Sequence, residues 1–225
     1  MNWGAIFLTV RLAFIVCLIL LTLALPIAYW LTYSRWRWKF LVESLVALPL
    51  VLPPTVLGFY VLVAIGSQSP LGRWYADWFG HGLAFTFQGL VLASVIYSLP
   101  FAVQPTAAAF ALVDLNLINA SSILGASRLR TFFQIILPLS IGGVMTGIVL
   151  SFAHTLGEFG VVLMVGGNIP GTTQTVSISI YDEVQSLNYA AANRTALLLL
   201  LFSFAVLSMT YAINRRVWAV WPLHR

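Results

Sequence analysis

Long apolar runs separated by short polar segments dominate the hydrophobic pattern of this chain. A helix needs roughly 20 predominantly apolar residues to cross the hydrocarbon core of a bilayer, and five stretches approach or exceed that length. The pattern therefore predicts an all-α fold, a polytopic transmembrane helical bundle of about five spans in a single domain over residues 1–225. The predicted spans cover residues 12–31, 40–65, 83–103, 139–165 and 196–213.

Prolines interrupt two of these predicted spans. Pro49, Pro53 and Pro54 lie inside residues 40–65. Because proline removes a backbone donor and clashes with the preceding turn, this span is predicted to be kinked or broken. Such a break either serves helix packing alone or lines a cavity, since irregular backbone at membrane depth must be covered by protein or water. Pro100 is expected to interrupt the third span.

The longest polar-interrupted segment is NASSILGASRLRTFFQIILP, residues 119–138, at the end of a loop predicted over residues 104–138. Its spacing predicts a short helix that stops at Gly125, an N-cap at Ser127 and a second helix that enters the membrane. This pair is either a simple connection or a docking element for a soluble partner. The apolar residues expected to be exposed on the first helix are Leu117, Ile118 and Ile123.

Composition excludes an ordinary soluble domain, because 60% of the residues are hydrophobic and only 8% are charged. The mean hydropathy is +0.96. The formal net charge of +5 does not indicate nucleic-acid binding, since the cations lie at the ends of apolar runs, where they meet lipid headgroups. Cys17 is the single cysteine, so the sequence contains neither a disulfide framework nor a cysteine metal site.

The positions of the basic residues predict an orientation. Three clusters follow the first, third and fifth predicted spans, so all three lie on one side of the membrane, which the positive-inside rule makes cytoplasmic. The amino terminus is then outside and the carboxyl terminus cytoplasmic. The clusters are Arg35, Arg37 and Lys39, then Arg128 and Arg130, then Arg215, Arg216 and Arg225.

Candidate chemistry is sparse. No phosphate-binding loop or metalloprotease motif occurs, so this chain is not expected to hydrolyse ATP. His154 and Glu158 form the one ionisable pair inside a predicted span, four residues apart and so on one helix face. A packing or gating role is favoured over a metal or catalytic role. An intramembrane enzyme would need a third group, for which Ser151 is the near candidate, and an autonomous carrier would need repeated halves and a charged relay.

Residues 119–138 resemble the cytoplasmic signature loop of ABC importer permeases, whose pattern is Glu-Ala-Ala, three residues, Gly, nine residues, Ile, one residue, Leu-Pro. Asn119 replaces the usual acid of that pattern, and Ser121 replaces its second alanine, so this chain lacks the charge that the acid would supply. The matching positions are Asn119, Ala120, Ser121, Gly125, Ile135, Leu137 and Pro138.

Three further stretches make the chain similar to the permease subunit of molybdate ABC importers, the ModB family. They are LPLVLPPTVLG at residues 48–58, LGEFG at residues 156–160, and NIPG at residues 168–171, which Thr173-Gln174-Thr175 follows. The resemblance implies the fold of a type I ABC importer permease and transport of molybdate across the cell inner membrane. Tungstate and sulfate permeases are similar enough that both anions stay open as alternatives.

The resemblance also implies partners. These are a second copy of this chain, two ATPase subunits on the cytoplasmic face and an extracytoplasmic oxyanion-binding protein, with ATP and Mg²⁺ held by the ATPase and no cofactor, metal or catalytic residue in this chain. Closure of the ATPase would reach the spans through the signature loop. The residues expected to couple to the ATPase are Asn119, Ala120, Ser121, Gly125, Ala126, Ser127 and Arg128.

No Lys or Arg lies in the middle of a predicted span, so tight anion affinity is expected to belong to the delivering protein. The path would use hydroxyl groups, amides and the ends of broken helices. Because an ionised Glu158 facing the path would repel molybdate, it is expected to be paired, protonated or turned toward a helix contact. The candidate pathway or gate residues are Pro53, Pro54, Thr55, His154, Gly157, Glu158, Gly160, Asn168, Pro170 and Gly171.

Overall fold

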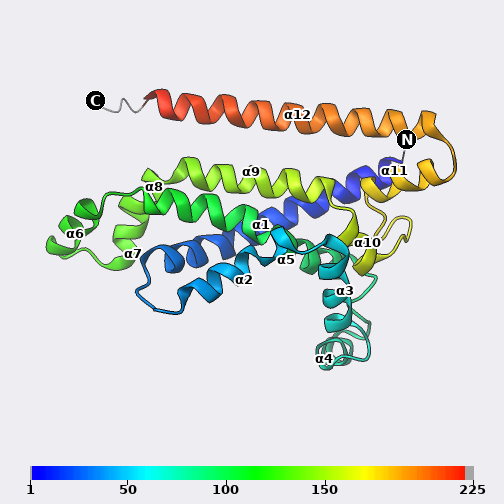
Figure 1. The fold of residues 1–225 in the computed structure, drawn as a ribbon, viewed down its shortest axis with the longest axis horizontal. Helices are drawn as coiled ribbons and strands as arrows, with labels where there is room; N and C mark the ends of the chain where they lie inside the picture. Colours follow the sequence, from blue (N-terminus) through cyan, green and yellow to red (C-terminus); the bar gives the residue numbers. More distant parts are fainter. Residues whose placement is uncertain (1, 221–225) are drawn as a thin grey trace.

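The computed structural model describes the backbone of residues 2–220, and within these residues it is helical with no strand (Figure 1). The helices α1, α5, α9 and α12 run along the length of a bundle, and shorter helices lie at its ends and on one side (Figure 1). In chain order they are α1 (Trp3–Tyr33), α2 (Lys39–Val51), α3 (Pro54–Ile65), α4 (Pro70–Phe79), α5 (Phe87–Ala111), α6 (Leu115–Ile123), α7 (Arg128–Thr131), the π-helix η1 (Phe132–Ile136), α8 (Leu137–Leu139), α9 (Ile141–Gly157), α10 (Gly160–Gly166), α11 (Val176–Gln185) and α12 (Tyr189–Val220).

The core of the bundle lies where α1, α5 and α9 pack along one another. Large apolar side chains such as Leu12, Leu90 and Phe110 are completely buried there. Two glycines of α9 allow the close approach of α5. A Cβ atom on Gly143 would lie 2.3 Å from the Cβ of Ala109, and one on Gly147 would lie 2.8 Å from the Ala102 carbonyl oxygen.

Three of the described helices are long and apolar enough to cross a membrane, namely α1, α5 and the first part of α12 (Tyr189–Met209). Two bent pairs raise the possible number of spans to five. The helices α2 and α3 meet at an angle of 115°, as the prolines of this segment predict. The second bent pair joins residues Arg128–Leu139 to α9 at 72°.

The prediction that Pro100 interrupts the third span is wrong. The helix α5 continues through both Pro100 and Pro105 to Ala111. A proline deprives one carbonyl of its helical donor, but α5 is packed between α1 and α9, and neighbouring helices hold such a segment straight enough to stay helical. The polar connection that was predicted to begin at residue 104 therefore begins only after Ala111.

Other helix ends also differ from the predicted spans. The helix α1 starts at Trp3 rather than at residue 12, and α12 starts at Tyr189 rather than at residue 196. The predicted span 139–165 is two helices, α9 and α10, with a break at Glu158 and Phe159. The predicted loop after residue 65 contains α4, whose N-cap Ser69 accepts a hydrogen bond from the Gly72 backbone at 2.8 Å.

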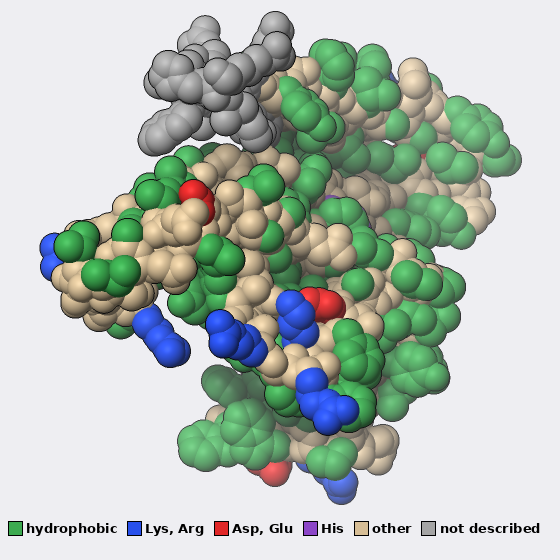
Figure 2. Space-filling view, turned by 60° about the vertical axis from the view of Figure 1, so that its left-hand side comes forward, with side chains coloured by type: hydrophobic (Ala, Val, Ile, Leu, Met, Phe, Trp, Pro, Cys, Tyr) green, Lys and Arg blue, Asp and Glu red, His purple; other side chains and the backbone are tan. Residues whose placement is uncertain are grey.

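The two ends of the bundle differ in character. The turn between α1 and α2, the helices α6 and α7 and the final part of α12 lie at one end, whereas the amino terminus, α10 and α11 lie at the other (Figure 1). Figure 2 shows Lys and Arg side chains gathered toward the end that carries α6 and α7. Arg225 lies outside the described residues, as do the side chains of Arg215 and Arg216.

Candidate functional site

Two helix breaks lie against each other in the bundle. One separates α2 from α3 at Leu52 and Pro53, and the other separates α9 from α10 at Glu158 and Phe159. The contact between them runs through Gly160, where an added Cβ would lie 2.9 Å from the Cβ of Pro54. The structure therefore brings together Pro54, Thr55 and Gly160, which the sequence suggested as separate pathway candidates.

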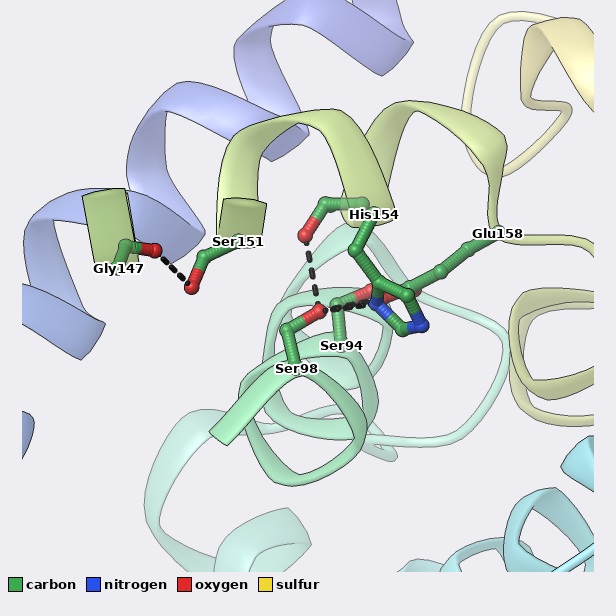
Figure 3. A network of polar contacts seen from close by, with 7 residues as sticks. Ser94, Ser98, Gly147, Ser151, His154 and Glu158 are labelled. Carbon is green, nitrogen blue, oxygen red and sulfur yellow. Dashed lines mark hydrogen bonds and ion pairs between the residues drawn. The ribbon is translucent and has the colours of Figure 1, made fainter. Parts of the chain in front are cut away.

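A buried polar network holds the second break (Figure 3). The Glu158 side chain lies at the end of α9 and is 4% exposed. Its Oε2 atom accepts a hydrogen bond of 2.5 Å from Ser94 Oγ, and its Oε1 atom accepts one of 2.8 Å from Ser98 Oγ. Both serines belong to α5, so the network fastens the end of α9 to the neighbouring helix.

His154 completes the network one turn before Glu158. Its Nδ1 atom lies 2.9 Å from Ser98 Oγ and 3.6 Å from Glu158 Oε1. A hydroxyl group carries a single proton, so a Ser98 that donates to Glu158 accepts from His154 Nδ1–H and from Thr155, whose Oγ1 is 3.0 Å away. The imidazole ring stacks on Phe101 at a centroid distance of 4.0 Å.

This arrangement fits an anchor better than a catalytic group. Both carboxylate oxygens are occupied, and Ser98 is fully buried, so no substrate reaches its hydroxyl. Ser151, the third group that an intramembrane enzyme would need, instead donates to the Gly147 carbonyl of its own helix at 2.8 Å. No group of three or more His, Cys, Asp or Glu side chains that could hold a metal occurs in the described part of the chain.

Three of the remaining predicted pathway candidates lie together in a second region, the turn after α10. Asn168, Pro170 and Gly171 lie in an exposed turn after α10, in which Gly171 has a φ of +76°. The Asn168 amide donates to Asp182 Oδ2 on α11 at 2.7 Å, so the turn is tied to α11 and not to Glu158. Thr55 is exposed at the start of α3, and Gly157 has open space around it.

The segment between α5 and α9 forms the predicted pair of short helices. Asp114 caps α6, and Gly125 then ends it with a φ of +79°, a conformation that glycine adopts without strain. Ser127 caps α7, since its side chain accepts a hydrogen bond from the Arg130 backbone at 3.3 Å. The prediction for this segment is confirmed up to this point.

The second helix does not enter the bundle directly. Pro138 has no backbone N–H, so the Gln134 carbonyl lacks its α-helical donor, and the turn before it is a π-helix in which Leu137 N–H donates to the Phe132 carbonyl. A bend of 72° then separates this segment from α9. The protruding element formed by α6 and α7 is therefore set at an angle to the span that follows it.

Ser121, a departure from the importer signature, has a structural role. Its hydroxyl is buried and lies 2.8 Å from the hydroxyl of Thr131, which joins α6 to the end of α7. Asn119, the other departure, is exposed together with Ala120, and its side chain forms no hydrogen bond with the described residues. Arg128 is likewise exposed, so these side chains face outward on the protruding element.

The apolar surface of α6 and α7 differs from the prediction at one position. Ile118 is half-buried and packs against the main core, so it is not part of the exposed surface. Leu117 is 47% exposed and Ile123 is 86% exposed, as expected. Leu124 at 86% and Leu129 at 72% extend this surface across the turn.

A family model described as the binding-protein-dependent transport system inner membrane component matches residues 21–219. This range includes both helix breaks, the Glu158 network and the protruding element. The chain belongs to this family of importer permeases.

Similar proteins place the permease more narrowly, in the ModB family. It is 49% identical over 213 residues to the molybdenum transport system permease protein ModB of Azotobacter vinelandii, with 94% of each chain covered. It is 38% identical over 185 residues to ModB of Escherichia coli K12, covering 82% of the permease and 81% of that relative. A probable sulfate transport system permease protein, cysT of Chlorella vulgaris, is 32% identical over 218 residues, covering 95% and 81%.

Solved structures show the same fold. The permease resembles a chain of a bacterial ABC transporter involved in the import of alginate with a TM-score of 0.75 and 18% identity, covering 95% of the permease and 79% of that chain. It resembles a chain of the MetNI methionine ABC transporter with a TM-score of 0.70 and 16% identity, covering 96% of each. The all-α fold of a type I ABC importer permease, predicted from the sequence, is confirmed.

Sequence reasoning missed part of the polar network. Ser94 and Ser98 were not among the predicted site residues, although they occur four residues apart in an apolar span, as do His154 and Glu158. Two such pairs on facing helices are a recognisable signal, because each pair lies on one helix face. The sequence alone does not tell which two faces meet.

Proposed function

We propose that this chain is the permease subunit of an ATP-driven importer that carries molybdate, or the chemically similar tungstate, across the cytoplasmic membrane. The observation that carries this proposal is the 49% identity to A. vinelandii ModB over 94% of both chains. A sulfate permease is the second candidate and is less well supported, since the sulfate relative is 32% identical. The permease itself would hydrolyse no ATP; a separate ATPase would bind ATP and Mg²⁺.

The protruding element formed by α6 and α7 would dock the ATPase. It exposes Ile123, Leu124 and Leu129 at the end of the bundle where the basic residues gather (Figure 2). An apolar surface of this kind outside the membrane is suited to burial by a protein partner. Because Gly125 and the Ser121–Thr131 hydrogen bond fix the two short helices to each other, ATPase closure would move them as one body.

This docking sets the orientation that we propose. The end with α6, α7 and the turn that carries Arg35 and Arg37 would face the cytoplasm, in agreement with the positive-inside rule. The amino terminus would be outside. An extracytoplasmic binding protein would then deliver the oxyanion to the end formed by α10, α11 and the Asn168 turn, and one structural neighbour is a bacterial alginate transporter in complex with a pentasaccharide-bound periplasmic protein.

The break between α2 and α3 supports a homodimer with one path between the copies. Val51 is 82% exposed there, and Pro53 and Pro54 lack the N–H groups that would satisfy the Pro49 and Leu50 carbonyls. Lipid does not satisfy such carbonyls, so this backbone must face protein or water. A second copy that faces the break would supply the protein, and the water-filled path between the copies would satisfy the remaining groups.

The test is uptake of labelled molybdate into proteoliposomes that hold this permease and its ATPase, with binding protein outside and ATP inside. We expect ATP-dependent uptake that excess tungstate blocks and excess sulfate does not. Equal inhibition by sulfate would favour the sulfate permease, and uptake without ATPase would contradict the importer assignment.

A further inference from the structure

A hollow of about 640 Å³ opens between the end of α1, the start of α2 and the end of α5. The helix ends that line it lie at the end of the bundle that carries α6 and α7 (Figure 1). Its deeper walls are apolar and include Val46, Val103 and Ala107. Its polar lining consists of Thr32, Lys39, Glu43, Ser44 and Gln104.

Two of these polar side chains have no hydrogen-bond partner in the part of the chain that the structure describes. Gln104 is exposed, although it lies seven residues before the end of α5 at Ala111, a depth of about 10 Å at the rise of an α-helix. Neither its amide nor the exposed Ser44 hydroxyl forms a hydrogen bond with the described residues. Such groups are costly in hydrocarbon and are found where they face a water-filled cavity. The hollow therefore has the character of an aqueous space.

Lys39 supplies positive charge to this space. Its Nζ atom donates to the Leu31 carbonyl at 3.3 Å and lies 3.7 Å from Glu43 Oε1. The lysine and glutamate side chains are 38% and 47% exposed, so the ion pair is solvent-accessible and weak. Lys39 is also the first residue of α2, which has no side-chain N-cap, so the helix start adds to the positive potential.

We propose that this hollow is a water-filled exit vestibule in which Lys39, Ser44 and Gln104 form a transient site for a tetrahedral oxyanion. The ammonium, hydroxyl and amide groups donate hydrogen bonds to the anion, and Glu43 competes with it for Lys39. The competition keeps affinity low, as release requires, because a conducting site must let its ion leave. The inference rests on the proposed function and assigns residues to the last step of transport.

Cysteine labelling tests whether the hollow holds water. Ser44→Cys and Leu45→Cys are made in a Cys17→Ala background, since Leu45 is adjacent on α2 and 67% exposed but does not line the hollow. A membrane-impermeant anionic methanethiosulfonate is added to the cytoplasmic side of the nucleotide-free permease–ATPase complex in membranes. A thiol in an apolar environment is poorly ionised, so we expect labelling at position 44 to be about tenfold faster than at position 45, or more.

Tungstate tests the anion site. We expect millimolar tungstate to slow labelling of Ser44→Cys relative to chloride at equal ionic strength, by about threefold at twice the dissociation constant. Adding Lys39→Gln should abolish this protection, whereas adding Glu43→Gln should shift it to lower tungstate concentration. The tighter tungstate binding expected for Glu43→Gln tests the site even if the Lys39→Gln variant does not fold.

Two results would overturn the proposal. Equally slow labelling at both positions would show that lipid or a second copy fills the hollow, and fast labelling that tungstate does not slow would leave water without an anion site. The labelling does not require transport, so the anion site in the hollow and the proposed function are tested separately. Normal uptake without tungstate protection contradicts the vestibule, and tungstate protection without ATP-dependent uptake contradicts the proposed function.

Discussion

At the scale of single residues, Glu158 shows how a carboxylate is held inside a membrane protein. Its two oxygens are occupied by the hydroxyls of Ser94 and Ser98, and no buried side-chain nitrogen or oxygen atom among the described residues lacks a partner. This agrees with the expectation that Glu158 is paired, protonated or turned toward a helix contact, since both serines belong to α5. Its position at the break between α9 and α10 makes it an anchor for the break.

Replacing Glu158 separates its hydrogen-bonding role from its charge. Glu158→Ala removes the carboxylate that accepts from two buried serine hydroxyls and leaves Ser94 without its acceptor, so we expect a loss of about 1–3 kcal/mol in the free energy of unfolding. Glu158→Gln keeps polar partners for both serines and should retain most of the uptake. Thermal unfolding in detergent and molybdate uptake in proteoliposomes measure the two effects.

Ser151→Ala is the matched control for these variants. Ser151 is also fully buried near this end of α9, but its hydroxyl bonds only to its own helix backbone. It should therefore change neither the unfolding temperature nor the uptake appreciably. If Glu158→Gln abolished uptake while folding normally, the charge would be essential and the anchor role insufficient.

The close packing of α9 on α5 gives a second prediction for single residues. Gly147→Ala would place a Cβ atom 2.8 Å from the Ala102 carbonyl oxygen, so the two helices must separate. We expect a loss of about 1–3 kcal/mol in unfolding free energy, measured by thermal unfolding. Gly157→Ala is the control, because a Cβ atom there meets no other atom within 4 Å. Equal stability of the two variants would contradict the packing account.

Residue patterns predicted the helix caps correctly but did not predict which side chains meet between helices. The spacing around Gly125 and Ser127 was sufficient to predict the two caps, because capping depends on local sequence. The Ser94 and Ser98 contacts were missed because they depend on which faces of α5 and α9 meet. Ile118 was expected to be exposed for the same reason, since its burial comes from the main core and not from its own helix.

At the scale of elements, coupling of the ATPase to the spans depends most on the conformation of the turn between α6 and α7. Gly125→Pro is incompatible with a φ of +79° and removes the N–H that donates to the Ser122 carbonyl. We expect the variant to enter the membrane and to permit ATP hydrolysis, while uptake falls by about 5- to 100-fold through lost coupling. Parallel assays of ATP hydrolysis and molybdate uptake in the same proteoliposomes measure this.

Gly125→Asn is the control for this element. Asparagine adopts the left-handed conformation more readily than other non-glycine residues, so the turn keeps its shape. Uptake should therefore remain close to that of the unmodified permease. Normal uptake by Gly125→Pro would rule out the assignment of this element as the ATPase dock.

The elements themselves were predicted unevenly. Three closely spaced prolines were sufficient to predict the break between α2 and α3, because two successive carbonyls lose their donors. A single proline was not sufficient in α5, which stays helical under the packing of its neighbours. The break between α9 and α10 carries no proline, so it was not predicted, and residues 139–165 were expected to form one span.

At the scale of the whole molecule, three regions of the chain are connected in the proposed transport cycle. The protruding element lies at one end, the two helix breaks touch each other through Pro54 and Gly160, and the turn that holds Asn168 lies near the other end. In the proposed importer, ATP binding by the ATPase docked on the protruding element changes the breaks and so opens or closes the path. The order of the spans and the position of the first two basic clusters were predictable from hydropathy and charge, but the contact between the breaks was not.

The most direct test of this central claim is the distance between spin labels at the break in the two copies of the assembled transporter. Thr55→Cys in a Cys17→Ala background places one exposed label on each copy. Pulsed electron paramagnetic resonance compares the nucleotide-free complex with one trapped in the ATP-bound state. The account predicts a distance distribution that shifts on ATP binding, and the shift should disappear with Gly125→Pro. If no distance between labels on two copies were detected, or if the distance distribution stayed the same on ATP binding, the proposed movement of the breaks would be contradicted.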